Sequence, residues 1–473
     1  MTHPAPHPRV LAVGAYERDN FGDLLFLLVT ERYLEGSEVV SASPFSADMT
    51  ALLDRQVVAL GDELQEREYD AIWSVGGQVG GISIETAYRL STPREEYAAY
   101  RRATPDVQER LIAEALNGAP IVSPYIPTPA AFERNAGAVT VLNSVGVAGI
   151  AGRPVRIHHE LVSVLKTTDI VSVRDKESSD FLTGLGVEHT LAPDVVHAIG
   201  VLEPFEPAPD NDVVVLQVSS GIAAQLGHEA IAEQLVGSRH LGGSTVRFVQ
   251  AGLAAGHDSM ADAERIAERI RQLSPSTGIE FATGRRPMEV VEAIRDSRLV
   301  IGTSLHVRII AASYARPRVT FVRKKPTRYA RHWDPHMPYN VAVADLEEAM
   351  GAALEAGQRP EVVEASRELS RLADQNVRSI AERVRELSAQ RAGSVREQRA
   401  EARRAALADA AGRADLDVDG IRRELGKTRA ELRATQTELA RTKEQLAQAR
   451  SDAQARGRGL GERLLRRSGL AGR

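Results

Sequence analysis

Residues 298–315 read RLVIGTSLHVRIIAASYA, a short apolar run followed by a turn of small residues and then a helical pattern. A β-branched run, a glycine-containing turn and a helix are together the signature of a βα unit around a parallel sheet. The start of the chain repeats this theme, because Arg9–Val13 predicts a strand, Glu17–Asp23 a loop and Leu24–Leu34 a buried helix. The sequence therefore predicts an α/β fold.

Further strands are expected on both sides of a proline-rich acidic segment, residues 202–212 (LEPFEPAPDND). That segment can continue neither a helix nor a central strand, so it predicts a domain boundary. We expect an N-terminal Rossmann-like domain over residues 1–205 and a C-terminal one over residues 206–345, facing each other across a cleft. The further strands are predicted at Glu38–Ser41, Asp70–Val75, Pro120–Ser123, Val139–Val145, Asp169–Val173, Asp212–Val218, Thr245–Gln250, Ile279–Ala282 and Arg318–Val322.

Strand signals cease near residue 345, and residues 346–473 are predicted to form a helical linker, a coiled coil and a basic tail. Apolar residues recur every seven positions, while three threonines weaken the intervening seam. This pattern predicts a homo-oligomer, most simply a dimer, although a single solvated helix fits the same spacing. The residues that recur are Val418, Leu425, Leu432, Leu439 and Leu446.

The basic end of the chain, residues 456–473, contains Leu460, Leu464 and Leu465 among its apolar residues. Such a segment suits peripheral contact with an anionic membrane surface, and it suits a disordered basic tail equally well. The N-terminus lacks a signal-peptide core, and no stretch is long and apolar enough to span a membrane. We therefore expect a cytoplasmic protein whose membrane contact, if any, is made at the inner face by the basic tail.

Composition excludes several kinds of function. The formal net charge of -5 over 473 residues is small, so no overall field points to nucleic acid as a partner. The chain has no cysteine, which excludes disulfides, thiolate metal sites and a cysteine nucleophile. His158, His159 and Glu160 have the residue types of a metal site, but adjacent helical residues diverge and favour surface placement. We expect neither a metal nor a cofactor.

Residues with a chemical role are expected at the carboxyl ends of the strands, where doubly wound sheets bind their ligands. The turn Gly302-Thr303-Ser304 leaves free N–H groups that suit a phosphate or carboxylate, although a hydroxyl here would cap the following helix in any case. His306 is poorly placed in the first turn of that helix unless a nearby anion favours its charged form. Other candidates are Asn20, Gly22 and Asp23, and the glycine-rich loop that begins with Gly76 and Gly77.

Arg174 follows an apolar strand and is expected to point into the cleft, where a guanidinium can grip a carboxylate or phosphate with two hydrogen bonds. The structural alternative is an ion pair with Asp175 or Glu177. For Asp23, the alternative to a role in chemistry is to cap the helix Leu24–Leu34.

The segment around Trp333 has two possible interpretations. His332 and His336 flank Trp333 in a stretch that follows Lys324 and Lys325. Sugar contacts and plain solvation explain this segment equally well.

The chain resembles the polysaccharide pyruvyl transferase family across about Val10 to Arg328. The matching pieces occur in the family's order, and they are residues 20–23 (NFGD), 76–77 (GG), 169–178 (DIVSVRDKES), 192–195 (APDV) and 299–306 (LVIGTSLH). The resemblance implies paired Rossmann-like halves, similar to the B-type glycosyltransferase fold. It also implies transfer of pyruvate from phosphoenolpyruvate to sugar hydroxyls, usually as a cyclic ketal, during assembly of surface polymers.

The resemblance implies roles for individual residues. His306 matches the family's histidine near the donor and is the candidate general acid, while Arg174 matches its arginine and is the candidate donor clamp. Asp23 is the candidate base for the incoming hydroxyl of a glycan or lipid-linked sugar. Substrate contacts are expected from Asn20, Gly22, Gly76, Gly77, Gly302, Thr303, Ser304 and Lys324.

One position departs from the family's pattern. Many members have arginine immediately before the Leu-His pair, where this chain has Ser304. Lys324 or Lys325 could supply the missing charge, whereas Arg308 points about 200° around the helix from His306.

Two other functions fit the same architecture, because a fold does not determine a function. A sugar-nucleotide glycosyltransferase needs an acidic residue at the ribose, for which Glu289 and Glu292 are the candidates. A non-catalytic scaffold would use the coiled coil for assembly, and Ser304 is the feature that favours it.

Overall fold

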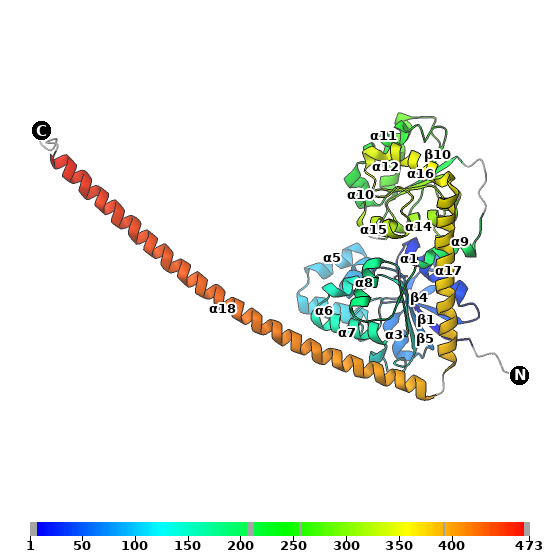
Figure 1. The fold of residues 1–473 in the computed structure, drawn as a ribbon, viewed down its shortest axis with the longest axis horizontal. Helices are drawn as coiled ribbons and strands as arrows, with labels where there is room; N and C mark the ends of the chain where they lie inside the picture. Colours follow the sequence, from blue (N-terminus) through cyan, green and yellow to red (C-terminus); the bar gives the residue numbers. More distant parts are fainter. Residues whose placement is uncertain (1–6, 206–211, 255–256, 391–392, 468–473) are drawn as a thin grey trace. The chain divides into compact units, whose positions relative to one another are not determined.

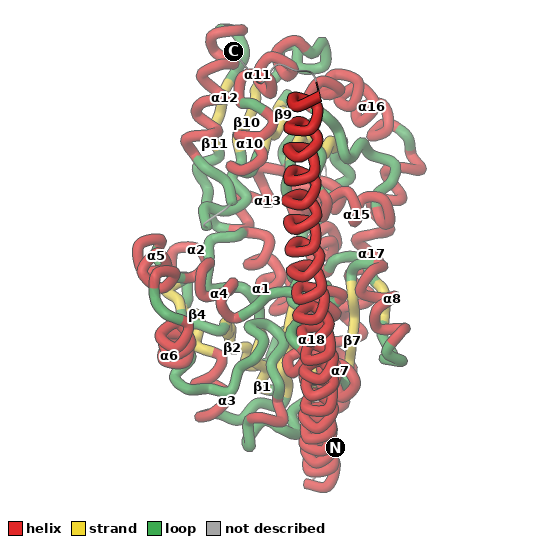
Figure 2. The backbone as a smooth tube through the Cα atoms, turned by 90° about the vertical axis from the view of Figure 1, so that its left-hand side faces the viewer, coloured by secondary structure: helices red, strands yellow, loops and turns green. Residues whose placement is uncertain are grey.

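The computed structural model describes residues 7–205, 212–254, 257–390 and 393–467. It contains two compact units, residues 1–410 and residues 411–473. Figures 1 and 2 show that the first unit holds two sheets, each flanked by helices. The predicted fold class, two Rossmann-like halves with a C-terminal helical region, is therefore confirmed.

The first sheet has eight strands in the order β3-β4-β2-β1-β5-β6-β7-β8, and every pairing except β3 with β4 is parallel. Strands β5 and β6 are buried along their whole length, as expected of a parallel sheet covered on both faces. The strands are β1 (Arg9–Val13), β2 (Glu38–Ser43), β3 (Ala47–Asp48), β4 (Gln56–Ala59), β5 (Ala71–Val75), β6 (Val139–Val145), β7 (Ile170–Val173) and β8 (Thr190–Leu191).

Two expectations in the first half need correction. Helix α1 (Phe21–Tyr33) begins before the predicted start at Leu24, because the Asn20 side chain caps it by accepting from the Gly22 N–H. The strand predicted at Pro120–Ser123 is wrong, since residues 119–128 contain three prolines and lack the N–H groups that sheet pairing needs. The other helices are α2 (Thr50–Leu53), α3 (Leu60–Glu66), α4 (Ile84–Ser91), α5 (Arg94–Arg102), α6 (Pro105–Ala115), α7 (Val155–Thr167), α8 (Lys176–Gly184) and α9 (Ile199–Leu202), with 3₁₀ turns η1 (Pro129–Ala131), η2 (Ala148–Gly152) and η3 (Val195–Ala198).

The second sheet is fully parallel, with the order β11-β10-β9-β12-β13. Its strands are β9 (Val213–Gln217), β10 (Thr245–Phe248), β11 (Ile279–Phe281), β12 (Leu299–Gly302) and β13 (Arg318–Thr320). Its helices are α10 (Ser220–Leu226), α11 (His228–Gly237), α12 (Met260–Leu273), α13 (Pro287–Arg295), α14 (Leu305–Ser313), α15 (Lys324–Trp333) and α16 (Leu346–Gln358), with the turn η4 (Val343–Asp345).

The two predicted domain limits have different outcomes. The limit at residues 205 and 206 falls at the edge of residues 206–211, which lie outside the described ranges. Beyond the other limit, at residue 345, α16 still belongs to the second half, because Leu346, Met350 and Ala353 pack in one cluster with the second sheet.

Helix α17 (Pro360–Ala389) runs beside both halves of the first unit (Figure 1). It packs against α14 of the second half and against α1 and β6 of the first. The Tyr33 hydroxyl donates to Asp374 at 2.6 Å, and Asn376 donates to the Ser172 hydroxyl at 3.0 Å. Helix α17 thus connects the two halves by packing against both.

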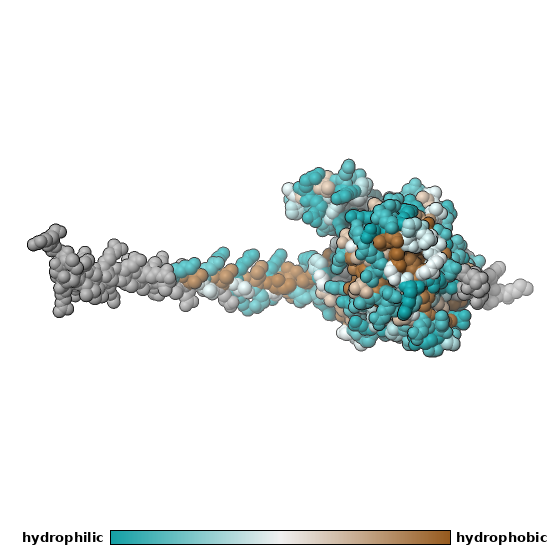
Figure 3. All heavy atoms as spheres, turned by 90° about the horizontal axis from the view of Figure 1, so that it is seen from above, coloured by the Kyte–Doolittle hydropathy of each residue, from teal (hydrophilic) through white to brown (hydrophobic). Residues whose placement is uncertain are grey.

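Helix α18 (Gly393–Arg467) differs along its length. Within the first unit, Arg403 is 3% exposed and donates to the carbonyls of Ala136 and Ala138 and to Asp169. In the second unit the helix carries apolar side chains open to solvent, and Figure 3 shows them along the rod. Among the described residues, no helix is long and apolar enough to cross a membrane.

Candidate functional site

The first turn of α1 places Asp23 at the carboxyl edge of the first sheet. Its carboxylate accepts hydrogen bonds from Asn20 Nδ2 at 2.7 Å and from Arg18 Nη2 at 3.0 Å. Burial alone would raise the pKa of Asp23, but the charges of Arg18 and Lys325 lower it below its ordinary value. Asp23 is therefore ionised at neutral pH, and it does not cap the helix.

The turn between β12 and α14 depends on Gln217, at the end of β9. The Gln217 Oε1 accepts the N–H groups of Thr303 and Ser304 at 3.1 and 2.9 Å. Asp258 holds this amide by accepting from Gln217 Nε2 at 2.8 Å. Ser304 is the N-cap residue by position, but its hydroxyl makes no cap hydrogen bond, so the expected hydroxyl cap is wrong. The amide oxygen thus takes two N–H groups that were expected to be free.

His306 lies in the first turn of α14 and is buried against the first half. Its ring lies edge-on to Phe26 with centroids 5.1 Å apart, and a Cβ on Gly22 would come within 1.9 Å of its Nδ1. Its Nε2 has no hydrogen-bond partner in the described part of the chain. Burial is the main cause that lowers the pKa of His306 to about 4, and the charge of Asp194 opposes the shift. The imidazole is therefore neutral at pH 7.

Arg174 follows β7 and is 1% exposed. Its Nη1 donates to the Asp194 carboxylate at 2.5 Å, so the alternative of an ion pair with Asp175 or Glu177 is wrong. Its Nη2 has no hydrogen-bond partner among the described residues. The Arg174 carbonyl accepts from Trp333 Nε1 at 2.8 Å. One side of the guanidinium is thus held, while the other keeps a donor for a ligand.

The start of α15 brings three cationic residues together: Arg323, Lys324 and Lys325. Cations at a helix N-terminus oppose the helix dipole. The first turn of the helix contains no acidic residue. Desolvation and the charge of Arg174 lower the pKa of Lys325 to about 8, while the carboxylates of Asp23 and Asp194 oppose this shift. This turn therefore carries positive charge that no acid of the same turn balances.

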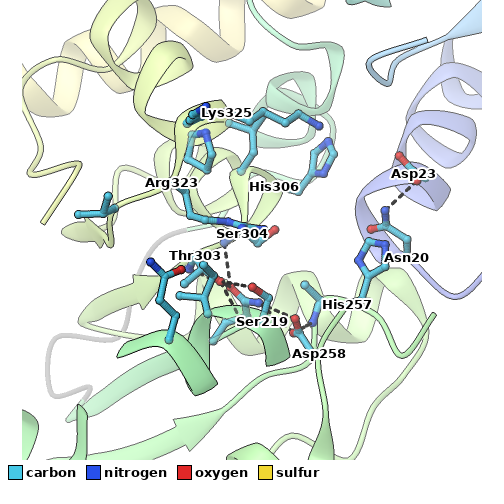
Figure 4. Close-up of a pocket in the computed structure, with 18 residues that line it drawn as sticks. Asn20, Asp23, Ser219, His257, Asp258, Thr303, Ser304, His306, Arg323 and Lys325 are labelled. Atoms are coloured by element: carbon cyan, nitrogen blue, oxygen red, sulfur yellow. Dashed lines mark hydrogen bonds between the residues drawn. The ribbon is translucent and has the colours of Figure 1, made fainter. Parts of the chain in front are cut away.

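Two neighbouring pockets lie in the cleft, and their volumes of about 630 and 700 Å³ are in the range of ligand sites. The first pocket is lined by Asn20, Asp23, Gln217, Asp258, Thr303, Ser304, His306 and the three cations of α15. Figure 4 shows Asn20 and Asp23 facing His306 across it. The second pocket is lined by residues that include Arg174, Arg328, Tyr329, Arg331, His332 and Trp333. Leu305, Lys324 and Lys325 line both.

Four glycines predicted to bind substrate line neither pocket: Gly22, Gly76, Gly77 and Gly302. Gly22 makes room for the ring of His306. Gly76 has a φ of +67°, and a Cβ there would come within 2.3 Å of the Phe26 ring, on which His306 packs. These two glycines therefore shape the site by making room for its side chains.

Several residues of the site were not singled out from the sequence. Gln217 ends a predicted strand, so the rule that places ligands at strand ends could have found it. Asp258 and Arg18 lie in loops that carry no pattern. The prediction that Arg308 points away is confirmed, because Arg308 is buried and pairs with Asp334 at 2.8 Å.

The histidine cluster in α7 shows no sign of metal binding. His158 Nδ1 lies 3.0 Å from the Ile150 carbonyl oxygen. In the part of the chain that the structure describes, no group of His, Asp and Glu could hold a metal ion.

Comparison with solved structures finds similar chains at low identity. UDP-GlcNAc 2-epimerase from Methanocaldococcus jannaschii is 11% identical, with a TM-score of 0.45 over 78% of this chain and 98% of that chain. UDP-GlcNAc 2-epimerase from Neisseria meningitidis bound to UDP-GlcNAc is 11% identical, with a TM-score of 0.44 over 80% and 99%. Anabaena Alr3699/HepE in complex with UDP-glucose is 13% identical, with a TM-score of 0.43 over 80% and 99%.

No curated protein matches the sequence. The sequence does match the model of one protein family, polysaccharide pyruvyl transferase. The match covers residues 110–324, which include Arg174, His306 and Lys324 but not Asn20 or Asp23. Over residues 110–324 this chain is therefore similar to the polysaccharide pyruvyl transferase family, the same family that its sequence motifs resemble.

Proposed function

We propose that this chain transfers a pyruvyl group from phosphoenolpyruvate to hydroxyls of a cell-surface polysaccharide or its precursor, forming a pyruvate ketal. One observation carries the proposal: the N-termini of α14 and α15 meet at the first pocket, which three cations and His306 line. Phosphoenolpyruvate carries a carboxylate and a phosphate, and both are stabilised by cations and helix N-termini.

The cations of the cleft support two contacts with this donor. Lys325 lies where the two pockets meet, and it supplies positive charge where many family members have an arginine in place of Ser304. Arg174 lines the second pocket, and its buried Nη2 has no hydrogen-bond partner among the described residues. The substrate thus meets charge on two sides.

His306 is the proposed general acid. Its pKa of about 4 belongs to the protein without an anion, and the negative charge of a bound donor raises that pKa. Donor binding therefore lets His306 take up from solvent the proton that the reaction needs. This link makes protonation depend on the presence of substrate.

The chemistry proceeds in two steps. A proton passes from His306 to the methylene carbon of the donor, the C=C electron pair becomes the new C–H bond, and C2 becomes electrophilic. A sugar hydroxyl bonds to C2 and gives its proton to Asp23, which Arg18 and Asn20 keep ionised. A second hydroxyl of the same sugar then displaces phosphate from C2, and its proton leaves with the phosphate. The products are a ketal and inorganic phosphate.

A thermal-shift comparison of phosphoenolpyruvate with sugar nucleotides tests the proposal, because a ligand of the folded state raises the melting temperature. We expect phosphoenolpyruvate to stabilise the wild type, and we expect phosphate release when an acceptor glycan is added. Stabilisation by sugar nucleotides alone would favour glycosyl transfer, for which Glu289 and Glu292 line a different pocket. A response to neither ligand would favour the scaffold.

A further inference from the structure

The proposed chemistry uses Arg174 of the second pocket and assigns no ligand to the rest of that pocket. It shares Leu305, Lys324 and Lys325 with the first pocket, so ligands in the two pockets would meet at these residues. Transfer between two substrates requires their reacting atoms to lie about 3–3.5 Å apart. A donor in the first pocket therefore places its acceptor in the second.

Aromatic side chains line the second pocket: Tyr329, His332 and Trp333. Trp333 is half-buried and held in position, because its Nε1 donates to the Arg174 carbonyl at 2.8 Å. The His332 ring packs edge-on against it with centroids 4.6 Å apart. A fixed aromatic surface suits the apolar C–H face of a sugar ring, so this wall favours sugar contacts for His332 and Trp333.

The same pocket carries an excess of positive charge. Glu177 neutralises Arg328, with 2.7 Å between the charged atoms. Asp175, another acid of the pocket, accepts the Ser178 N–H at the start of α8. Arg331 and Lys324 have no acidic partner in the ranges that the structure describes. Two cations thus remain beside the aromatic wall, and an anionic group on the ligand would pair with them.

We infer that the second pocket is the acceptor subsite and takes a sugar that bears an anionic group, either phosphate or carboxylate. This inference rests on the proposed function, since it names the acceptor of that reaction. The sugar ring packs on Trp333 and the anionic group pairs with Arg331. Its hydroxyls then face Lys325, where the donor ends.

Calorimetry on the full chain tests the inference with glucose, glucose 1-phosphate and glucuronate, each with and without phosphoenolpyruvate. We expect both anionic sugars, or the one whose anion the site prefers, to bind about 10-fold more tightly than glucose, as a charge-assisted hydrogen bond provides. The two anionic probes distinguish phosphate from carboxylate. Equal affinity for all three sugars would overturn the inference.

Variants identify the residues that bind the acceptor sugar. Arg331→Gln should remove most of the preference for the anionic sugar, with unchanged affinity for glucose and phosphoenolpyruvate. Arg102→Gln, at an exposed arginine of α5, is the matched control and should change nothing. Trp333→Ala should lower the affinity for all three sugars, and Trp333→Phe should keep part of that affinity. A loss of phosphoenolpyruvate affinity in Arg331→Gln, with sugar binding intact, would assign this pocket to the donor.

The two proposals fail in different ways. A wild type that binds anionic sugars but ignores phosphoenolpyruvate would overturn the proposed function and leave the sugar subsite in place. A wild type that binds phosphoenolpyruvate but shows no preference among the sugars would overturn only the subsite.

Discussion

The cleft and the helix beyond residue 410 expose different kinds of side chain, cationic in the cleft and apolar along the helix. At the start of α15, neither Lys324 nor Lys325 has an acidic residue in the same helical turn, although Asp23 and Asp194 lie near enough to interact with the charge of Lys325. In the unit of residues 411–473, by contrast, large apolar side chains are between 47% and 72% exposed, and they are Leu416, Ile421, Leu425, Leu432 and Leu439. The start of α15 carries an excess of positive charge, whereas the helix beyond residue 410 exposes apolar side chains to solvent.

This difference indicates what kind of partner each region takes. A group of cations beside a pocket is stabilised by a small anion, which suits a ligand site. A row of leucines at heptad spacing is covered best by a second helix of the same kind, which suits association. The two properties should therefore be separable by mutation.

The largest effect is expected from His306→Ala. Loss of a positioned proton donor should lower kcat about 10²- to 10⁴-fold, as measured by phosphate release at saturating phosphoenolpyruvate. The number of chains per particle should stay the same. Near-full activity in this variant would show that another group donates the proton.

The same histidine predicts a pH dependence of stability. Its pKa of about 4 in the folded protein lies below its ordinary value of about 6.5, so between these pH values the unfolded chain binds more protons. The free energy of unfolding should thus be highest above about pH 6.5 and fall as the pH drops toward 4. His306→Ala should weaken this fall without removing it, because burial also lowers the pKa of His197 to about 4. Denaturation curves at several pH values measure the free energy of unfolding. If this free energy changed with pH in the same way in the wild type and in His306→Ala, the lowered pKa of His306 would be contradicted.

Substitutions of Arg174 should affect donor binding next most strongly. Arg174→Lys keeps a charge beside Asp194 but loses the planar fork, so we expect the KM for phosphoenolpyruvate to rise about 10- to 100-fold. Arg174→Ala also leaves Asp194 buried without its partner and should destabilise the fold by about 3–5 kcal/mol. In the double variant Arg174→Ala with Asp194→Ala, stability should recover while donor affinity stays low. Recovery of both would make Arg174 purely structural.

Gly22→Ala should have a smaller effect. Its methyl group would overlap the His306 ring, so the ring must move, and we expect a loss of about 1–3 kcal/mol in unfolding free energy. Activity should fall with the displaced ring. Gly221→Ala is the control, because that helical position has open space around it and alanine there should stabilise by about 0.5–1 kcal/mol. If Gly22→Ala and Gly221→Ala changed the unfolding free energy by the same amount, the close approach of Gly22 to His306 would have no effect on stability.

Removal of residues 417–473 should have the smallest effect on turnover and the clearest effect on assembly. We expect light scattering to give a dimer for the full chain and a monomer for the shortened one. Activity per chain should remain within about twofold, since the cores of both halves lie before residue 411. The same number of chains in both proteins would count against association through the heptad residues.

The fold could be predicted from the sequence because its signals are local. Apolar runs such as Val139–Val145 and the turn at Gly302 mark strands and helix starts within a few residues. The strand expected at Pro120–Ser123 failed for a local reason as well, since three prolines lie in residues 119–128. Helix starts were less certain, because the cap by Asn20 depends on one hydrogen bond.

The site could be predicted only in part, because its geometry depends on residues far apart in the chain. The position of His306 followed from the turn before it. Its contact with Gly22, and the pairing of Arg174 with Asp194, depend on how the halves pack. The role of Gln217 likewise requires two strands to be neighbours, which no local pattern encodes.

The contact between Gly22 and His306 also makes the histidine a sensor of domain closure. The ring belongs to the second half, but the wall that sets its orientation is α1 of the first. A hinge motion that parts the halves would withdraw that wall, expose the imidazole to water and return its pKa toward the ordinary value. The open cleft would therefore favour the charged imidazole at mildly acidic pH, and closure without a bound anion would return it to the neutral form.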